Sequence, residues 1–431
     1  MTTRRAIGLR TLLPVLLATT CSFGALGSAQ AAESKAPKAG APGSLVAPGS
    51  GETAAFDAAL YNPAILRIGF SEAKGKTVNA GADAFLDITL IPADGEVHGA
   101  RSEVSLKRFN ELLRKLYGQL ASQAPLEVSD PNSPSRQLSA ILIQPVAEQL
   151  KRQRITTLLI SADAGLQAVP FAALHDGQSY LGEGFGLGLT PALGLTKLTV
   201  LPQKANPQLL SAGASEFQGL NPLPLVPQEL ERVSKGKGSE SYLNKAFTPQ
   251  VLLEKAADAQ FDRVHLATHA EFLPGGPAAA RLYSGIGPMS LKQLAQLRQR
   301  RGEAQFDVFT LSACRTALGD ADSELGFAGL ALQAGSRSAI GSLWYVDDVA
   351  TSALFVQFYR YLDQGIPKAE ALQLTRRAMA MGRMKLVGDQ VIGSGGDVLL
   401  AGLTTAQQRR IAGGLQHPFF WAGIQLLGTP W

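Results

Sequence analysis

The chain has 431 residues, of which 45% are hydrophobic and 17% charged, a composition typical of a globular protein and not of a disordered one. Its 45 glycines follow no three-residue period, which excludes a collagen-like repeat. The formal charge of +5 falls to +2 without the three arginines of the leader described next, so charge gives no indication of nucleic-acid binding.

Residues 1–32 are predicted to be an export signal. Arg4 and Arg5 precede a short apolar stretch, and small residues at Ala29 and Ala31 then form a suitable cleavage site. The apolar stretch is shorter than the ~20 residues that a membrane-spanning helix needs. We therefore expect cleavage near Ala31 and a periplasmic or secreted mature protein with no membrane span.

The cysteine count bears directly on function. Cleavage of the leader removes Cys21 and leaves Cys314 as the single cysteine of the mature chain. Exported proteins normally form disulfides, but this cysteine has no partner in its own chain. It is therefore either buried and inert or retained for its chemistry.

Composition and periodicity divide the rest of the chain. Residues 33–53 are rich in Ala, Gly, Pro and Ser, which predicts a flexible linker. Residues 54–150 are predicted to form a smaller α/β accessory region, with a strand at Phe85–Ile91 and an amphipathic helix at Val104–Ala121. A further apolar run at Thr156–Ile160 predicts the strand that follows this region.

Residues 151–431 alternate short apolar runs with helical stretches, which predicts a mostly parallel central sheet covered by helices on both faces, an α/β/α sandwich. The predicted strands of this region are Leu209–Ala212, Val264–Thr268, Val308–Leu311 and Ala339–Leu343. Residues 386–414, which are rich in glycine near their middle, are expected to be a mobile insertion. The run Phe419–Leu427 is expected to form a last edge strand.

His269 and Cys314 each follow a predicted strand of this sheet. Adjacent parallel strands lie about 4.8 Å apart, so groups beyond their carboxyl ends can meet, and an imidazole can activate a thiol as a nucleophile. Either residue alone fits a structural role; together they favour a catalytic dyad. His265 lies inside its strand, where a structural role is favoured over that of base. The sequence contains no paired-cysteine metal motif or phosphate-binding loop, so we expect no metal or organic cofactor.

Four sequence motifs, in the same order, resemble those of CHAT domains, which are relatives of caspases and separases. The motifs are VHLATHAEF ending at Phe272, LSACRTALG ending at Gly319, SLWYVDD ending at Asp348 and HPFFWAG ending at Gly423. The resemblance implies a caspase-like α/β/α fold over residues 151–431 and an exported cysteine endopeptidase that cleaves protein or peptide substrates.

The same resemblance assigns the roles of individual residues. His269 would be the base and Cys314 the nucleophile, with the backbone N–H groups of Cys314 and Ala270 holding the oxyanion. Related peptidases usually have glycine after the catalytic histidine, so Ala270 is a departure. Some relatives cleave after basic residues, and the candidates for the corresponding pocket are Asp347, Asp320 and Trp344. A helix N-cap or first-turn role is the alternative for the two aspartates of the SLWYVDD motif.

Two alternatives to a constitutive peptidase stay open. A CHAT scaffold with weak or no catalysis would use the same fold as a protein-interaction module, since an exposed thiol outside the cytosol is open to oxidation. A zymogen would become active after removal of the 33–60 region or of a loop.

Overall fold

The computed structural model describes most of the chain after residue 59. The described residues are 60–73, 79, 81–163, 165–190, 204, 206–236, 238–271, 281–290, 292–302, 304–313 and 326–431. The predicted leader and linker, together with Cys314 and Asp320, lie outside this set.

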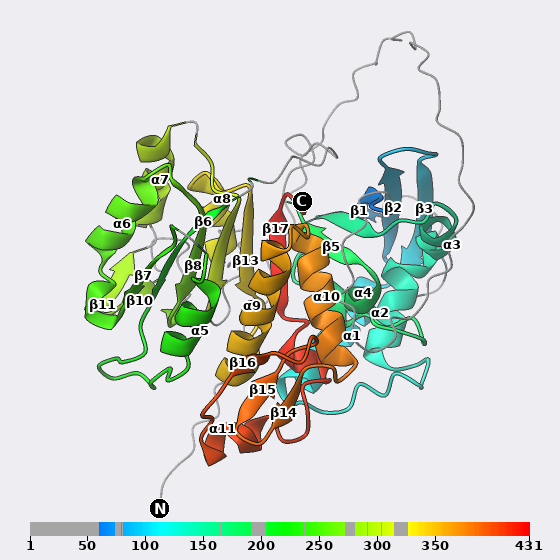
Figure 1. Cartoon of the computed structure of the whole chain (residues 1–431). Coiled ribbons are helices and arrows are strands. Elements are labelled where there is room, and N and C mark those ends of the chain that lie inside the picture. The colour runs from blue at the N-terminus through cyan, green and yellow to red at the C-terminus, as the bar shows by residue number, and fades with distance from the viewer. Residues whose placement is uncertain are drawn as a thin grey trace, which may run out of the picture. The chain divides into compact units, whose positions relative to one another are not determined.

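The centre of the fold is an 11-stranded sheet formed by described residues (Figure 1). In spatial order its strands are β3 (His98–Val104), β2 (Ala84–Pro92), β1 (Pro63–Glu72), β4 (Thr157–Ala162), β5 (Gly186–Leu189), β17 (Ile424–Gly428), β13 (Ser338–Ser342), β12 (Val308–Ser312), β8 (Phe261–Ala267), β6 (Gln208–Gly213) and β7 (Glu240–Leu243). Neighbouring strands are parallel from β1 to β17 and again from β13 to β7. The predicted mostly parallel sheet is therefore confirmed.

The final strand is not at an edge, contrary to the sequence-based expectation. β17 lies between β5 and β13, parallel to β5 and antiparallel to β13. Its residues from Ile424 to Leu427 are all buried, as expected of a strand with neighbours on both sides, and all but Gln425 are apolar.

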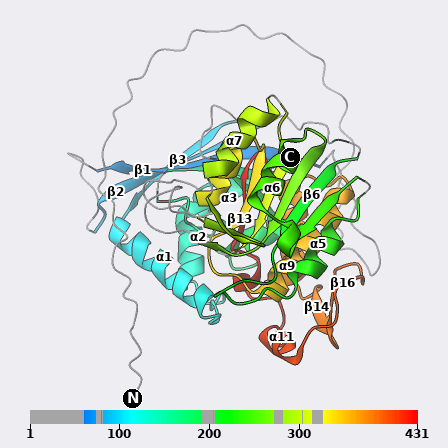
Figure 2. The same cartoon turned by 90° about the vertical axis from the view of Figure 1, so that its left-hand side faces the viewer.

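Helices cover both faces of the sheet. α5 (Val226–Val233), α9 (Asp348–Asp363) and α10 (Lys368–Ala380) pack together on one face. α6 (Pro249–Ala257), α7 (Lys292–Arg301) and α8 (Gly326–Gln333) pack on the other. Figure 2 shows α6 and α7 on one side of the strands and α5 and α9 on the other. The α/β/α arrangement follows from this two-sided covering.

The accessory region shares the sheet and the core of the rest of the chain. β1 pairs with β4 in parallel, and β2 and β3 extend the sheet by antiparallel pairing. α1 (Leu106–Ala121) begins at its N-cap Ser105, which accepts a hydrogen bond from the Arg108 N–H, and buries one apolar face. α2 (Pro134–Leu142) and α3 (Gln144–Arg152) follow it. One hydrophobic core includes buried residues of β1, α1, β8 and α9.

Residues 386–414 were expected to be a mobile insertion, and this expectation is wrong. They contribute to a three-stranded antiparallel sheet and a helix, namely β14 (Lys385–Val387), β15 (Gln390–Ile392), β16 (Val398–Leu400) and α11 (Thr405–Arg410). Val391, Leu399 and Leu400 are buried, and Thr404 caps α11. The glycines that suggested mobility form turns: Gly396 has a φ of 86°.

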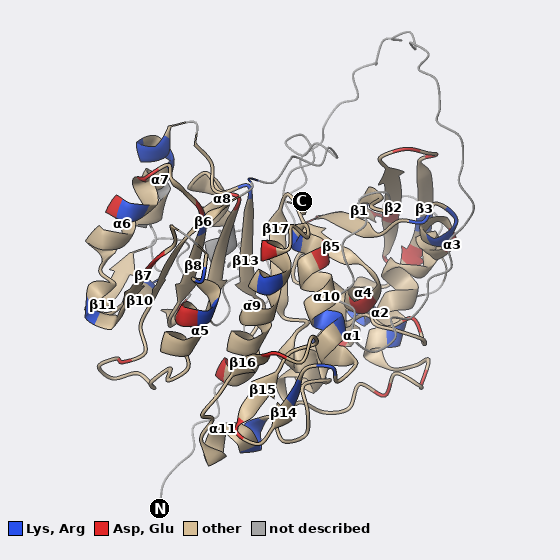
Figure 3. Cartoon of the chain, viewed as in Figure 1, with Lys and Arg blue, Asp and Glu red and all other residues tan. Residues whose placement is uncertain are grey.

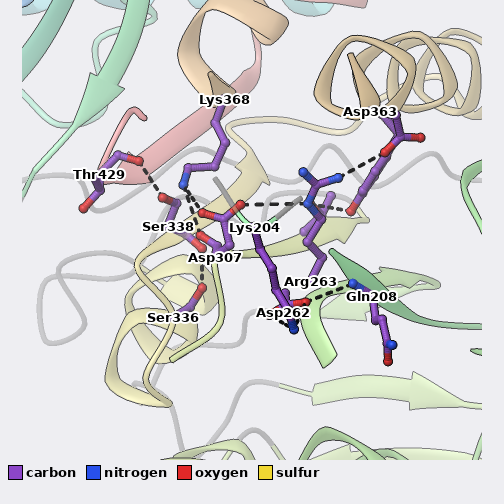
Figure 4. A network of polar contacts seen from close by, with 12 residues as sticks. Lys204, Gln208, Asp262, Arg263, Asp307, Ser336, Ser338, Asp363, Lys368 and Thr429 are labelled. Atoms are coloured by element: carbon purple, nitrogen blue, oxygen red, sulfur yellow. Dashed lines mark hydrogen bonds and ion pairs between the residues drawn. The ribbon is translucent and has the colours of Figure 1, made fainter. Parts of the chain in front are cut away.

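A network of charged residues holds the amino ends of β8 and β12 (Figure 4). The buried Arg263 side chain of β8 lies 3.2 Å from Asp363 and 3.8 Å from Asp307. The Lys368 Nζ lies 2.5 Å from Asp307 Oδ1, and burial lowers the pKa of Lys368 while Asp307 opposes this shift. The network lies at the opposite end of these strands from His269, so it is remote from the candidate catalytic residues.

Charges of both signs are interspersed along the chain, for example on α5 and α6 (Figure 3). Within the described part of the chain, no helix is both long enough and apolar enough to cross a membrane.

Candidate active site

Three parallel strands, β8, β12 and β13, end at one edge of the sheet, and His269 lies just beyond the end of β8. Ala267 at the end of β8 pairs with Ser312 at the end of β12, and Thr310 of β12 pairs with Ile340 of β13. One residue further on, the Thr268 N–H donates a 3.3 Å hydrogen bond to the Ser312 carbonyl. The segments that follow β8 and β12 therefore start side by side.

The His269 ring is held by the loop between β6 and α5. Its Nε2 lies 2.7 Å from the Asn221 carbonyl oxygen, and the Phe217 ring packs against it with centroids 4.6 Å apart. A carbonyl only accepts, so Nε2 carries the hydrogen and donates it. In the neutral ring Nδ1 is then the nitrogen with a lone pair, which is the state that a general base requires.

The segment leading to the candidate nucleophile is anchored from the other side. Ala313, the residue before Cys314, is buried, and its carbonyl accepts a 2.7 Å hydrogen bond from the Ser342 hydroxyl of β13. Cys314 and the pocket candidate Asp320 themselves lie outside the described residues. Ala313 thus lies anchored at the same edge of the sheet as His269.

The residue after His269 begins a small second sheet. β9 (Ala270–Glu271) pairs with β10 (Arg281–Ser284), which pairs in turn with β11 (Gly287–Ser290). Ala270 is opposite Leu282, and the Tyr283 N–H donates to the His269 carbonyl. Because hydrogen-bonded and non-hydrogen-bonded pairs alternate in an antiparallel ladder, the Ala270 N–H points away from β10. It is therefore not used by this ladder.

A hollow that is open to solvent lies at this edge. His269 and Ala313 line one side of it, with Thr268 and Ser312 between them. The other side comes from α5 and α9 and combines an apolar wall with two carboxyl groups. Residues on this side of the hollow include Leu223, Val226, Glu229, Val346, Asp348 and Ser352.

Glu229 supplies the buried carboxylate of the hollow. Its Oε1 lies 2.8 Å from His265 Nε2, and its Oε2 accepts a 2.5 Å hydrogen bond from the Ser352 hydroxyl. His265 Nδ1 has no hydrogen-bond partner among the described residues and lies among the rings of Phe355 and Tyr359. A doubly protonated ring would bury an unpaired N–H there, so the contacts favour a neutral ring that donates through Nε2. His265 thus has the structural role expected of it.

The two aspartates after β13 differ in their surroundings. Asp347 is the N-cap of α9: its Oδ1 accepts from the Ala350 N–H at 3.0 Å, and its Oδ2 lies 3.1 Å from Arg410 Nε. Asp348 lies in the first turn, pairs with Arg410 Nη2 and lines the hollow. Burial raises the pKa of Asp348, and the Arg410 charge works against this rise. The N-cap alternative describes Asp347 and the first-turn alternative describes Asp348, which also lines the hollow.

Trp344, the third pocket candidate, is a packing residue in this structure. Its indole is buried, donates a 3.0 Å hydrogen bond from Nε1 to the Phe419 carbonyl, and meets the Tyr117 ring edge-on. Gly423 lies so close that an added Cβ would be 2.5 Å from the indole. His417 caps the short helix Pro418–Phe420, accepting from the Phe419 N–H and donating to the Ala124 carbonyl.

Sequence reasoning missed Glu229 and Asn221. Glu229 had a signal: it occupies the apolar face of α5 together with Val226, Leu230 and Val233, where a carboxylate is unusual. Asn221 contributes a backbone carbonyl, which any residue could supply, so its identity carries no signal.

The family model of the CHAT domain matches residues 132–429, more than half of the chain. The protein belongs to the CHAT domain family. The resemblance predicted from the four motifs is thus confirmed, and the match begins within the predicted accessory region. A comparison with curated proteins finds no match.

Two solved structures are among those that match this chain. The crystal structure of the Arg-specific cysteine proteinase gingipain R, an enzyme of Porphyromonas gingivalis, has a TM-score of 0.40 at 10% identity and covers 68% of each chain. The Saccharomyces cerevisiae separase–securin complex has a TM-score of 0.46 at 12% identity over 86% of this chain. The CHAT protein corresponds to 30% of that chain.

Proposed function

We propose that this CHAT protein is a cysteine endopeptidase with Cys314 as nucleophile and His269 as base. The observation that carries the proposal is the His269 ring, fixed through Nε2 at the sheet edge where the anchored segment of Cys314 begins. Family membership supports the same assignment.

The proposed reaction follows from these two groups. The Cys314 thiolate attacks the peptide carbonyl carbon and forms a thioester as the C–N bond breaks, and protonated His269 gives its proton to the leaving amine. A water molecule then attacks the thioester, its proton passes to His269, and the thiolate leaves. The N–H groups of Cys314 and Ala270 are proposed to stabilise the oxyanion.

We further propose that the hollow accepts a basic side chain of the substrate. Leu223, Val226 and Val346 offer an apolar wall for an aliphatic stem, and Glu229 and Asp348 offer negative charge for its head. Glu229 and Asp348, and not Asp347 and Trp344, are thus the residues that support a preference for cleavage after a basic residue. Asp320 keeps its place as a candidate from the sequence.

Fluorogenic peptides with Arg, Lys, Leu or Asp before the cleaved bond test the proposal. We expect hydrolysis after Arg and Lys, its loss in Cys314→Ala, and a loss of at least 100-fold in His269→Gln, since general base catalysis contributes ~10²–10⁴-fold. His98→Gln, in edge strand β3, is the matched control and should keep wild-type activity. A folded protein that hydrolyses none of these peptides, and still hydrolyses none after the 33–60 region is removed, would reject the peptidase and favour the interaction module.

Export is proposed on the sequence alone. The leader and the linker lie outside the described residues, and the expected mature N-terminus follows Ala31.

A further inference from the structure

The segment from β14 to α11 is attached to both helices that supply the carboxylates of the hollow. Gln228 of α5 exchanges two hydrogen bonds with Ala401, of 3.0 Å from its Nε2 and 2.6 Å to its Oε1. At the start of α9, Arg410 of α11 contacts Asp347 and Asp348. β16 also packs against both α5 and α9, and Figure 1 shows this segment beside the end of α9. The residues flanking the hollow are therefore held by one segment.

Arg410 is shared between two carboxylates that differ in exposure to the hollow. Its Nε pairs with Asp347 at 3.1 Å, while its Nη2 pairs with Asp348. Asp347 is also fixed as the N-cap of α9, whereas Asp348 lines the hollow. The chain thus places a cation of its own on a carboxylate that a basic substrate side chain would use.

This internal ion pair can be exchanged. The Arg410 side chain is 48% exposed, and water screens an ion pair that it reaches, so the contact with Asp348 is weak. The contact with Asp347 allows Arg410 to stay anchored when its Nη2 leaves Asp348. An entering guanidinium or ammonium could then replace Nη2 on Asp348 without leaving either carboxylate unpaired.

We propose that Arg410 is a specificity-determining residue that competes with the basic side chain of the substrate for Asp348. The inference rests on the proposed function, because it concerns the same hollow. Arg410 lowers the negative charge available to a cationic side chain and has little effect on the binding of a neutral one. The wild-type enzyme therefore prefers a basic over a neutral substrate side chain less strongly than it would if Arg410 did not pair with Asp348.

The test compares Arg410→Gln with Arg409→Gln, which removes the same charge from the same helix. Arg409 is exposed and forms no ion pair with the described residues. We expect the ratio of kcat/KM for an Arg peptide to that for a Leu peptide to rise about fivefold in Arg410→Gln and to stay at the wild-type value in Arg409→Gln. An unchanged or lower ratio in Arg410→Gln would overturn the inference.

Two further measurements support the test: a second substitution of Arg410, and the binding of a cation, which does not depend on peptidase activity. Arg410→Lys keeps the charge, but its single ammonium group cannot hold both aspartates as Nε and Nη2 of Arg410 do, so its ratio should lie between those of wild type and Arg410→Gln; a ratio below that of wild type would also overturn the inference. Benzamidine, a cation that is not cleaved, should bind Arg410→Gln more tightly than wild type by calorimetry, and equal or weaker binding would refute the competition. If no peptide is hydrolysed, the proposed function fails while benzamidine binding still decides the role of Arg410.

Discussion

The carboxyl group of Glu370 makes the stability of the fold depend on pH. Glu370 lies in the first turn of α10, where its Oε1 accepts a hydrogen bond from the Thr157 hydroxyl of β4. Its Oε2 is buried and has no hydrogen-bond partner among the described residues. Burial raises the pKa of Glu370 from its ordinary value of 4.5 to about 7, and the hydrogen bond from Thr157 opposes this rise. The protonated form is thus the one that the folded chain favours.

The sign and size of the effect follow from this shift. Below pH 4.5 the carboxyl group is protonated in the folded and the unfolded chain alike. Between pH 4.5 and 7 the unfolded chain loses this proton first, so the free energy of unfolding falls as pH rises. Above pH 7 the folded chain carries a buried charge at a cost of up to about 3 kcal/mol. Replacing Glu370 by Gln removes this cost.

Urea unfolding followed by tryptophan fluorescence at pH 5 and pH 8 measures the difference. We expect Glu370→Gln to exceed wild type by less than about 1 kcal/mol at pH 5 and by up to about 3 kcal/mol at pH 8. Glu148→Gln, exposed on α3, is the control and should not change the pH dependence. A difference between Glu370→Gln and wild type that is the same at both pH values would refute the reasoning.

Three further predictions concern the site, its surroundings and the leader. Ser342→Ala leaves the Ala313 carbonyl without its hydroxyl donor, so we expect kcat to fall about tenfold with little change in KM, measured with the Arg peptide; an unchanged kcat would contradict the anchoring role. His417→Ala removes a cap and the bond to the Ala124 carbonyl, and should lower the free energy of unfolding by about 1–2 kcal/mol in urea; no loss would show that neither contact stabilises the fold. Intact mass spectrometry of the exported protein should find an N-terminus just after Ala31, and a retained leader would contradict the export prediction.

The sequence predicted those features that depend on local pattern. The buried strands β4, β6, β8, β12 and β13 each appeared as a short apolar run, because strands covered on both faces bury every side chain. The end of β8 could be aligned with that of β12 because parallel neighbours keep a regular register. The edge of the sheet that holds His269 was therefore predictable from strand ends alone.

Features that depend on long-range packing could not be predicted in this way. The hollow takes Glu229 from α5 and Asp348 from α9, which are 119 residues apart in sequence and meet because both helices cover the same face. The insertion of β17 between β5 and β13 likewise depends on which strand edges the rest of the chain leaves unpaired. Neither arrangement has a local sequence signal.

Reaction of the cysteine with a thiol-directed probe tests the proposed dyad most directly. Labelling of Cys314 by iodoacetamide at neutral pH, followed by peptide mass spectrometry, gives the rate in wild type, His269→Gln and the control His98→Gln. The account predicts labelling at least tenfold faster in wild type and His98→Gln than in His269→Gln, because the imidazole promotes formation of the thiolate. Equally slow labelling of all three proteins would contradict it.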